Sequence, residues 1–276
     1  MENKPATHCY YPGLKDKRIV IIGGTSGIGL AAGKAFMDSG AKVVAVGLEN
    51  EYYEAAGEIY SGNGLQIAGD AVLAETAVLA VNLCVETFGG MDGLFHVAGG
   101  SGRKWGDGPI HQLTAEGWQK TLALNLTSVM YSNQAAVRFW LDHAVGGSIL
   151  NVGSVLAASP SPAFFTTHAY AAAKAAITGL TLSLAAAYAP HNIRANVLAP
   201  GLVETPMSRR AAEDEDILKF IRTKQPLDGG RMGKPDDLVG MVCYAMSDLS
   251  RFTTGQVFSV DGGWLLSEGQ IPPKHE

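Results

Sequence analysis

The chain has 276 residues, of which 47% are hydrophobic and 17% charged, and its formal net charge is −5. This size and apolar content suit one large α/β domain better than two small ones. Acidic and basic residues are scattered, so the sequence lacks a nucleic-acid footprint and we expect no nucleic-acid partner. The 3 cysteines lie far apart and form neither a metal-ligand pair nor a disulfide framework, which indicates a reducing compartment and no metal site.

Two segments bear on targeting. Residues 1–12 are polar and lack the apolar core of a secretory signal. The longest uncharged stretch, between Lys174 and Arg194, contains hydroxyl side chains and Pro190, which favours a buried helix that breaks near the proline over a membrane span. We therefore expect a cytoplasmic protein that does not bind a membrane.

Short β-branched runs alternate with longer helical stretches. We expect strands at 18–22, 42–46, 65–67, 93–97, 148–152, 194–198 and 256–260, and helices at 30–39, 75–88, 114–142, 169–188 and 235–247. The strands are mostly continuous apolar runs, as is typical of strands that are covered on both faces. Repeated βαβ units predict a doubly wound parallel α/β sheet of about seven strands, flanked by helices.

The alternation of strands and helices lapses at residues 202–230, which contain prolines and an acidic run. We expect a helical flap here rather than a second domain. Ligands bind outside the carboxyl ends of such strands, so a flap that follows a strand would lie over the ligand crevice as a lid. The expected organisation is one domain at 14–266, with an N-terminal tail at 1–13 and a C-terminal tail at 267–276.

A glycine-rich turn follows the first strand and leads directly into a helix; its candidate phosphate-binding residues are Gly23, Thr25, Ser26, Gly27, Ile28 and Gly29. Glycines allow close backbone approach, and the helix N-terminus offers free N–H groups and a positive dipole end to a pyrophosphate. The spacing differs from the G-x-G-x-x-G fingerprint. Taken alone, the glycines are also compatible with a purely structural turn.

The end of the second strand bears on cofactor choice. A carboxylate here binds the ribose hydroxyls of NAD, whereas a cation favours the extra phosphate of NADP. Position 47 is Gly, the next residue is Leu48, and Ser26 occupies another position where a basic residue could sit. The absence of positive charge favours NAD. Glu49, two positions late, is either a ribose contact or a solvated loop charge.

Tyr170 and Lys174 lie four residues apart, on one face of a helix. A free phenol has a pKa of roughly 10, and a nearby ammonium favours phenolate, so the pair can act as an acid or base nearer neutrality. A solvent-exposed pair on an Ala-rich helix is the alternative. Ser154 follows the preceding strand and can hold a substrate oxygen. Asn125, in an apolar helix, is either a proton-relay residue or a hydrogen-bonded structural amide.

In their order and spacing these motifs resemble the short-chain dehydrogenase/reductase family over residues 14–263. The resemblance implies a single-domain Rossmann-type fold that binds a nicotinamide dinucleotide. The family's catalytic tetrad matches Asn125, Ser154, Tyr170 and Lys174, of which the last two also contact the cofactor. Beyond the glycine turn, Leu48 and Glu49, the cofactor contacts expected are Asp70, Ala71, Ala98, Gly99, Gly100, Pro200, Gly201, Val203 and Thr205.

The resemblance also implies a reaction. Tyr170 exchanges a proton with the substrate oxygen, and Lys174 lowers the pKa of Tyr170 and holds the nicotinamide ribose. Ser154 polarises the carbonyl, Asn125 supports a water relay, and the cofactor carries the hydride. A homotetramer or homodimer is implied, assembled through the long helices at 114–142 and 169–188 and through the last strand.

The sequence departs from the family pattern in three places. Ile22 stands where the family usually has Thr, and His96-Val97 replaces the usual Asn-Asn before Ala98-Gly99. We expect His96 to replace Asn structurally rather than to act in catalysis. The interval from Ser154 to Tyr170 is a few residues longer than usual, and the extra residues, at 159–168, lie beside the expected substrate space.

Three segments should converge on the substrate: 101–107, 156–168 and the flap. Their candidate contacts are Arg103, Trp105, His168 and Arg209. We expect NAD-linked oxidation of a small oxygen-rich substrate such as a sugar, polyol or hydroxy acid; the alternative for these cations is solvated loop charges. Two other functions stay open, an NADPH-dependent ketoreductase of the 3-oxoacyl reductase type and a catalytically inactive dinucleotide-binding regulator.

Overall fold

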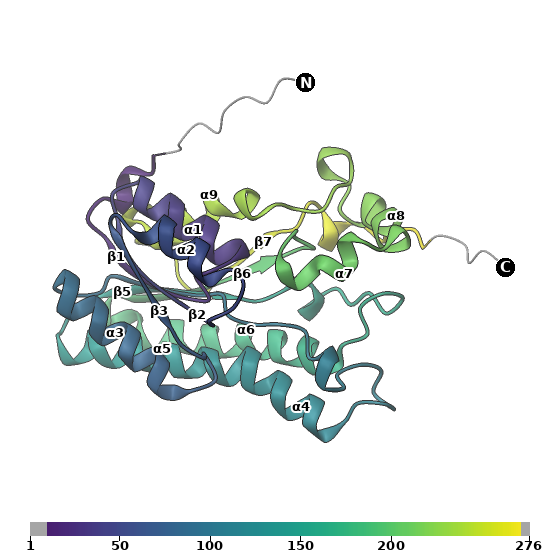
Figure 1. The fold of residues 1–276 in the computed structure, drawn as a ribbon, viewed down its shortest axis with the longest axis horizontal. Coiled ribbons are helices and arrows are strands. Elements are labelled where there is room, and N and C mark those ends of the chain that lie inside the picture. Colours follow the sequence, from purple (N-terminus) through teal and green to yellow (C-terminus); the bar gives the residue numbers. More distant parts are fainter. Residues whose placement is uncertain (1–9, 272–276) are drawn as a thin grey trace.

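The computed structural model describes residues 10–271. Seven parallel strands form one sheet in the order β3-β2-β1-β4-β5-β6-β7 (Figure 1). The strands are β1 Arg18–Ile22, β2 Lys42–Gly47, β3 Gly64–Ala68, β4 Gly93–His96, β5 Gly147–Val152, β6 Ile193–Pro200 and β7 Val257–Val260. The strand order reverses between β1 and β4, so the predicted doubly wound sheet is confirmed. Each expected strand lies within two residues of an observed one at either end, because buried parallel strands are marked by apolar runs.

Helices cover both faces of the sheet (Figure 1). α1 (Gly27–Asp38) and α9 (Pro235–Met246) lie on one face, and α3 (Ala74–Phe88), α5 (Ser128–Asp142) and α6 (His168–Tyr188) lie on the other. α2 (Tyr53–Tyr60) was not expected from the sequence. Its eight residues form a short helix with few buried side chains, and Tyr60 fixes it by packing into the core and donating a hydrogen bond to the carbonyl of Gly24 at 2.7 Å.

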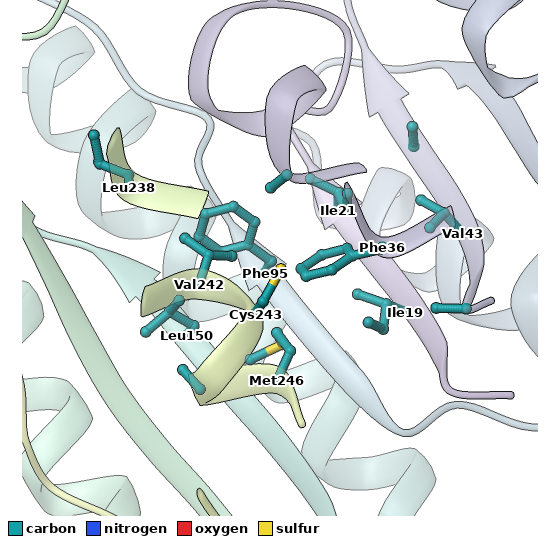
Figure 2. Packing of buried hydrophobic residues seen from close by; sticks show 14 of the residues in the cluster. Ile19, Ile21, Phe36, Val43, Phe95, Leu150, Leu238, Val242, Cys243 and Met246 are labelled. Atoms are coloured by element: carbon teal, nitrogen blue, oxygen red, sulfur yellow. The ribbon is translucent and has the colours of Figure 1, made fainter. Parts of the chain in front are cut away.

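Two apolar clusters fill the spaces between sheet and helices. Figure 2 shows the first, in which Phe36 of α1 and Met246 of α9 meet Ile19 of β1. The second lies under α3, α5 and α6 and includes Val20 and Trp140, both fully buried. Fully burying one such side chain contributes about 1.5–3 kcal/mol, so these layers hold the carboxyl ends of the strands in fixed positions.

The helix expected at 114–142 is interrupted. α4 (Ala115–Leu122) is followed by one turn of π-helix at Ala123–Thr127, and α5 then continues to Asp142. A π-turn inserts an extra residue in the helical repeat and occurs frequently at functional sites. It occurs here at the position of Asn125.

Residues 202–230 contain α7 (Arg209–Ala212) and α8 (Glu215–Lys224), which lie at one end of the sheet (Figure 1). α8 begins at the cap residue Asp214, whose carboxylate accepts hydrogen bonds from two backbone amides. Phe220 of α8 packs edge-on against Trp264 at 5.9 Å between ring centroids. The segment therefore has its own small apolar cluster, which joins it to the end of the domain.

One helical stretch in the described part of the chain, residues 168–191, is long and apolar enough to cross a bilayer by length and composition. It consists of α6 and the turn Ala189–His191, so the helix ends close to Pro190 as expected. Its most apolar window is 33% buried in a single copy of the chain. A core helix of a globular domain can have the same composition, so this stretch is weak evidence for a membrane span.

Candidate active site

A cavity of about 770 Å³ opens at the carboxyl ends of the strands. Its walls come from the ends of β1, β2, β4, β5 and β6, from the first turns of α1 and α6, and from residues 201–211. This is the edge where doubly wound sheets bind ligands, beside the reversal between β1 and β4. The cavity therefore lies where both a dinucleotide and its substrate are expected.

The glycine turn forms one end of this cavity. Gly23 has φ +93°, and a Cβ there would lie 2.6 Å from the backbone nitrogen of Ala98. A Cβ on Gly29 would lie 2.0 Å from the carbonyl oxygen of Gly23, so Gly29 closes the turn and does not line the cavity. The N-cap of α1, Ser26, makes no side-chain hydrogen bond to the helix. The first N–H groups of α1 are thus left for an anion, and the turn fits a pyrophosphate.

The end of β2 forms the expected adenosine side. Leu48 is 53% exposed and lines the cavity together with Asn50, Asp70 and Ala71. Glu49 is exposed and does not line the cavity. Of the two roles considered from the sequence, the structure therefore favours a solvated loop charge over a ribose contact. A Cβ on Gly47 would lie 2.0 Å from Oγ1 of Thr25, which explains the small residue at this strand end.

Tyr170, on the first turn of α6, is buried and lines the cavity. Burial raises the pKa of its phenol, and a hydrogen bond with the Ser154 hydroxyl opposes that rise. Ser154 lies two residues after the end of β5 and also lines the cavity. The two hydroxyls therefore face the same space, and a substrate oxygen placed between them can contact both.

Lys174 lies one helical turn after Tyr170, and its Nζ is 5.6 Å from the centroid of the phenol ring. The ammonium donates a hydrogen bond to the carbonyl of Val152 at 2.8 Å. Burial lowers the pKa of Lys174 to about 8, because the charged form loses its hydration. The solvent-exposed pair considered from the sequence is thus excluded: both side chains are buried.

Asn125 is fully buried in the π-turn, and both the oxygen and the nitrogen of its amide have hydrogen-bond partners. Its Oδ1 accepts from the backbone N–H of Gly100 at 3.0 Å, and its Nδ2 donates to the carbonyls of Gly100 and Thr121 at 2.9 Å each. The amide therefore locks the segment after β4 to the helix. A Cβ on Gly99 would lie 2.8 Å from this Oδ1, so the glycine is needed for the contact.

His96 is 1% exposed and lies between two serines of α5. Its Nδ1 is 2.7 Å from Oγ of Ser132, and its Nε2 is 3.3 Å from Oγ of Ser128. Burial, and secondarily the charge of Lys174, lower the pKa of His96 to about 3, so the ring is neutral at physiological pH. Both ring nitrogens have partners in the helix, and His96 does not line the cavity. This geometry supports the structural role expected for it.

Asp107 is a site residue that sequence reasoning missed. Its carboxylate is buried, and its two oxygens accept hydrogen bonds from the N–H groups of Ala169 and Tyr170 at 3.0 Å each. The N-cap residue of α6, Thr167, makes no side-chain cap hydrogen bond. Asp107 therefore caps the catalytic helix from a loop about 60 positions earlier in the chain. No local spacing rule reveals such a cap.

Two of the four expected substrate contacts line the cavity, namely Arg103 and Trp105. His168 is exposed at the start of α6 and lies outside the lining. Arg209 also lies outside: its guanidinium donates to the Tyr52 hydroxyl at 2.6 Å and is 3.6 Å from the Glu51 carboxylate. Arg210 lines the cavity instead. Neighbouring helical residues point in directions about 100° apart, so the sequence could not decide between the two arginines.

These residues can perform acid–base chemistry on a carbon–oxygen bond. The phenol of Tyr170 can exchange a proton with a substrate oxygen, which the Ser154 hydroxyl can hold. A nicotinamide dinucleotide, when bound, supplies or accepts the hydride. Within residues 10–271, no group of three or more His, Cys, Asp or Glu side chains is arranged to hold a metal ion.

Known proteins resemble the chain along most of its length. A family model described as enoyl-(acyl carrier protein) reductase matches residues 23–265. A 2-(S)-hydroxypropyl-CoM dehydrogenase of Xanthobacter autotrophicus is 33% identical over 257 residues, which cover 91% of this chain and 97% of the relative. The 3-oxoacyl-(acyl-carrier-protein) reductase FabG of Chlamydia pneumoniae is 34% identical and covers the same shares, 91% and 97%.

The fold comparison agrees. A short-chain type dehydrogenase/reductase from Mycobacterium ulcerans superimposes with a TM-score of 0.84 at 29% identity, over 92% of each chain. An L-rhamnose 1-dehydrogenase (NAD(P)(+)) of Azotobacter vinelandii is 31% identical over 92% of this chain and 98% of the relative. The chain therefore belongs to the short-chain dehydrogenase/reductase family, and it is an oxidoreductase that acts on CH–OH groups with a nicotinamide cofactor.

Proposed function

We propose that the protein catalyses the NAD-linked oxidation of a small, polar secondary alcohol of the sugar, polyol or hydroxy-acid class. The observation that carries this proposal is the pairing of Tyr170 with Ser154, beside the buried Lys174, inside one cavity. That cavity runs from the uncapped N-terminus of α1 to the cationic side chain of Arg103 and the aromatic ring of Trp105. It has room for a dinucleotide at one end and a small substrate at the other.

The preference for NAD rests on charge. Around the end of β2 the cavity is lined by Leu48, Asn50 and Asp70, none of which is a cation. The arginine beside this region, Arg209, lies 3.6 Å from Glu51 and donates to Tyr52, so its charge has partners already. A 2′-phosphate would meet no unpaired cation there, whereas the ribose hydroxyls of NAD need none.

The competing function is NADPH-dependent ketone reduction, which the 34% identity to a 3-oxoacyl-(acyl-carrier-protein) reductase favours. Steady-state kinetics with NAD⁺, NADP⁺, NADH and NADPH separates the two. We expect kcat/KM for alcohol oxidation to be at least about 10-fold higher with NAD⁺ than with NADP⁺, equivalent to about 1.4 kcal/mol. A preference for NADPH in ketone reduction would overturn the proposal.

The catalytic part of the proposal is tested by Tyr170→Phe, which removes the phenolic hydroxyl and keeps the ring. General acid–base catalysis contributes roughly 10²- to 10⁴-fold, so kcat should fall by that factor. The dissociation constant for NADH, measured by fluorescence titration, should change by less than about 2-fold, because Tyr170 is one of many groups around the cofactor site. A variant with the same turnover as an active wild type would overturn this role of Tyr170, and a wild type that binds NADH but turns over no alcohol or ketone would support a dinucleotide-binding regulator.

We further propose a cytoplasmic homotetramer or homodimer. β7 is an edge strand of the sheet with Val257 45% exposed, and Leu182 on the apolar helix α6 is 47% exposed. An exposed apolar helix face and an open sheet edge are surfaces that a second copy can cover. Light scattering after gel filtration tests this assembly. A monomeric wild-type protein would overturn it, and Leu182→Glu should weaken any assembly that forms through α6.

A further inference from the structure

The substrate end of the cavity carries a charge opposite to that of the chain as a whole. The chain has a formal net charge of −5. Apart from the catalytic Lys174, the charged residues that line the cavity are Arg103, Lys104, Arg210 and Asp70. Asp70 lies at the adenosine side, after β3. The three remaining charges are all positive, and no carboxylate lines the cavity beside them.

Two of these cations reach the cavity from different parts of the chain. Arg103 stands on the short turn Arg103–Trp105 that follows β4, and one of its guanidinium nitrogens donates to the carbonyl of Phe164 at 3.2 Å. Arg210 stands on α7 of the flap. Both side chains line the same cavity. In agreement with this, burial lowers the pKa of Arg103, and the positive charge of Arg210 lowers it further.

Neither arginine has a carboxylate within ion-pairing distance in the part of the chain that the structure describes. Asp107, whose charge opposes the lowering of the Arg103 pKa, has both oxygens bound by amides of α6. The third cation differs, since Lys104 Nζ lies 4.5 Å from the centroid of the Trp105 ring and has an aromatic partner. Arg209, adjacent to Arg210, is bound outside the cavity by Tyr52 and Glu51.

Arg103 and Arg210 line one cavity without a carboxylate partner among residues 10–271, and both are exposed, so their N–H donors are accessible to an anion in that cavity. Guanidinium is the protein group that best matches oxyanions, because its planar N–H donors bind two oxygens at once. We propose that Arg103 and Arg210 form an anion subsite that holds a carboxylate, sulfonate or phosphate group of the alcohol substrate. The proposal rests on the proposed function, and within it selects hydroxy acids or other anionic alcohols over neutral sugars and polyols.

The subsite is tested by binding, without turnover. The protein is loaded with NADH and titrated by calorimetry with alcohols, which form dead-end complexes with the reduced cofactor. The anionic probes are 3-hydroxybutyrate, 2-hydroxypropanesulfonate and glycerol 3-phosphate, which separate the three oxyanions. The neutral counterpart of the first two probes is 3-hydroxybutyramide, and that of the third is glycerol. At least one anionic probe should bind about 10-fold or more tightly than its neutral counterpart, as expected of charge-assisted hydrogen bonds.

Three variants assign the effect. Arg103→Gln and Arg210→Gln should each weaken binding of the preferred anion by about 10-fold or more, and should change binding of the neutral counterpart by less than about 2-fold. Arg209→Gln is the matched control, because it removes the same charge from the adjacent residue of the same helix, outside the cavity. It should leave anion binding within about 2-fold of wild type.

The possible results separate this inference from the proposed function. No preference for any anion over its neutral counterpart, or unchanged anion binding in both Arg→Gln variants, means that these cations are solvated and overturns the subsite. Loss of NADH binding in either variant assigns that arginine to the cofactor phosphates and also overturns it. Selective anion binding without oxidation of any probe supports the subsite and contradicts the proposed function. Equal oxidation of charged and neutral alcohols supports the proposed function and contradicts the subsite.

Discussion

The cap on the catalytic helix gives a prediction whose size follows from the structure. Asp107 is 5% exposed, and each of its carboxylate oxygens accepts one hydrogen bond, from Ala169 and Tyr170, at 3.0 Å. In Asp107→Ala both amides lose their acceptor inside the protein. A helix cap contributes about 0.5–2 kcal/mol, and hydrogen bonds to a charged group about 1.5–3 kcal/mol each. We therefore expect a loss of about 2–4 kcal/mol in the free energy of unfolding.

This loss should be visible in stability and in catalysis. At roughly 2–4 °C per kcal/mol for a domain of this size, the melting temperature should fall by about 5–15 °C. One of the two capped amides belongs to Tyr170, so the catalytic residue shifts with the first turn of α6. A misplacement of about 1 Å can cost roughly 100-fold, and we expect kcat at 20 °C, where the variant is still folded, to fall by about 10- to 100-fold. In Asp107→Asn, which keeps one acceptor, the melting temperature and kcat should lie between those of Asp107→Ala and those of wild type.

The control is Asp214→Ala. Asp214 also accepts hydrogen bonds from two amides, but on α8, away from the tetrad. Asp214→Ala should lower the free energy of unfolding by about 1 kcal/mol and leave kcat within about 2-fold of wild type. Calorimetric melting and steady-state kinetics measure both effects. The reasoning is refuted if Asp107→Ala has the melting temperature of wild type, or if it is less stable but keeps the kcat of wild type.

Two further predictions concern His96 and Leu48. Burial lowers the pKa of His96 from 6.5 to about 3, so its neutral ring contributes stability that is complete above pH 6.5 and is lost as the pH falls toward 3. Between pH 7 and pH 5, the free energy of unfolding measured in urea should fall by about 2 kcal/mol less in His96→Asn than in wild type. An equal fall in both proteins would contradict this. Leu48→Arg should raise the kcat/KM ratio of NADP⁺ to NAD⁺ by about 10-fold, and an unchanged ratio would place Leu48 away from the 2′-hydroxyl.

The strands and the reaction centre could be predicted from the sequence for one physical reason. A parallel strand buried on both faces needs an unbroken apolar run, so residues such as 18–22 and 42–46 stand out without any tertiary information. Tyr170 and Lys174 are likewise local, because one helical face sets their spacing. Ser154 lies just beyond the end of a predicted strand, and strand ends meet at one edge of a parallel sheet. The structure accordingly brings all three to the same cavity wall.

What the sequence left open depends on contacts between distant segments. Asp107 and the first turn of α6 are about 60 positions apart and meet only after the loop that follows β4 has folded. The choice between Arg209 and Arg210 depends on the rotation of a one-turn helix. The π-turn at Asn125 is held by hydrogen bonds to the backbone of Gly100 and Thr121, and helical periodicity in the sequence does not predict it. In each case, a tertiary hydrogen bond or packing contact decides the local structure.

The loop after β4 links substrate recognition to the catalytic residues. At its start Gly100 exchanges two hydrogen bonds with Asn125, and at its end Asp107 holds the first turn of α6. Between these two points stand Arg103 and Trp105, which line the cavity. A change in this loop that alters the substrate contacts therefore also changes the supports of Asn125 and Tyr170. Exchanging the loop with that of a relative should lower kcat as well as alter KM unless Gly100 and Asp107 are retained.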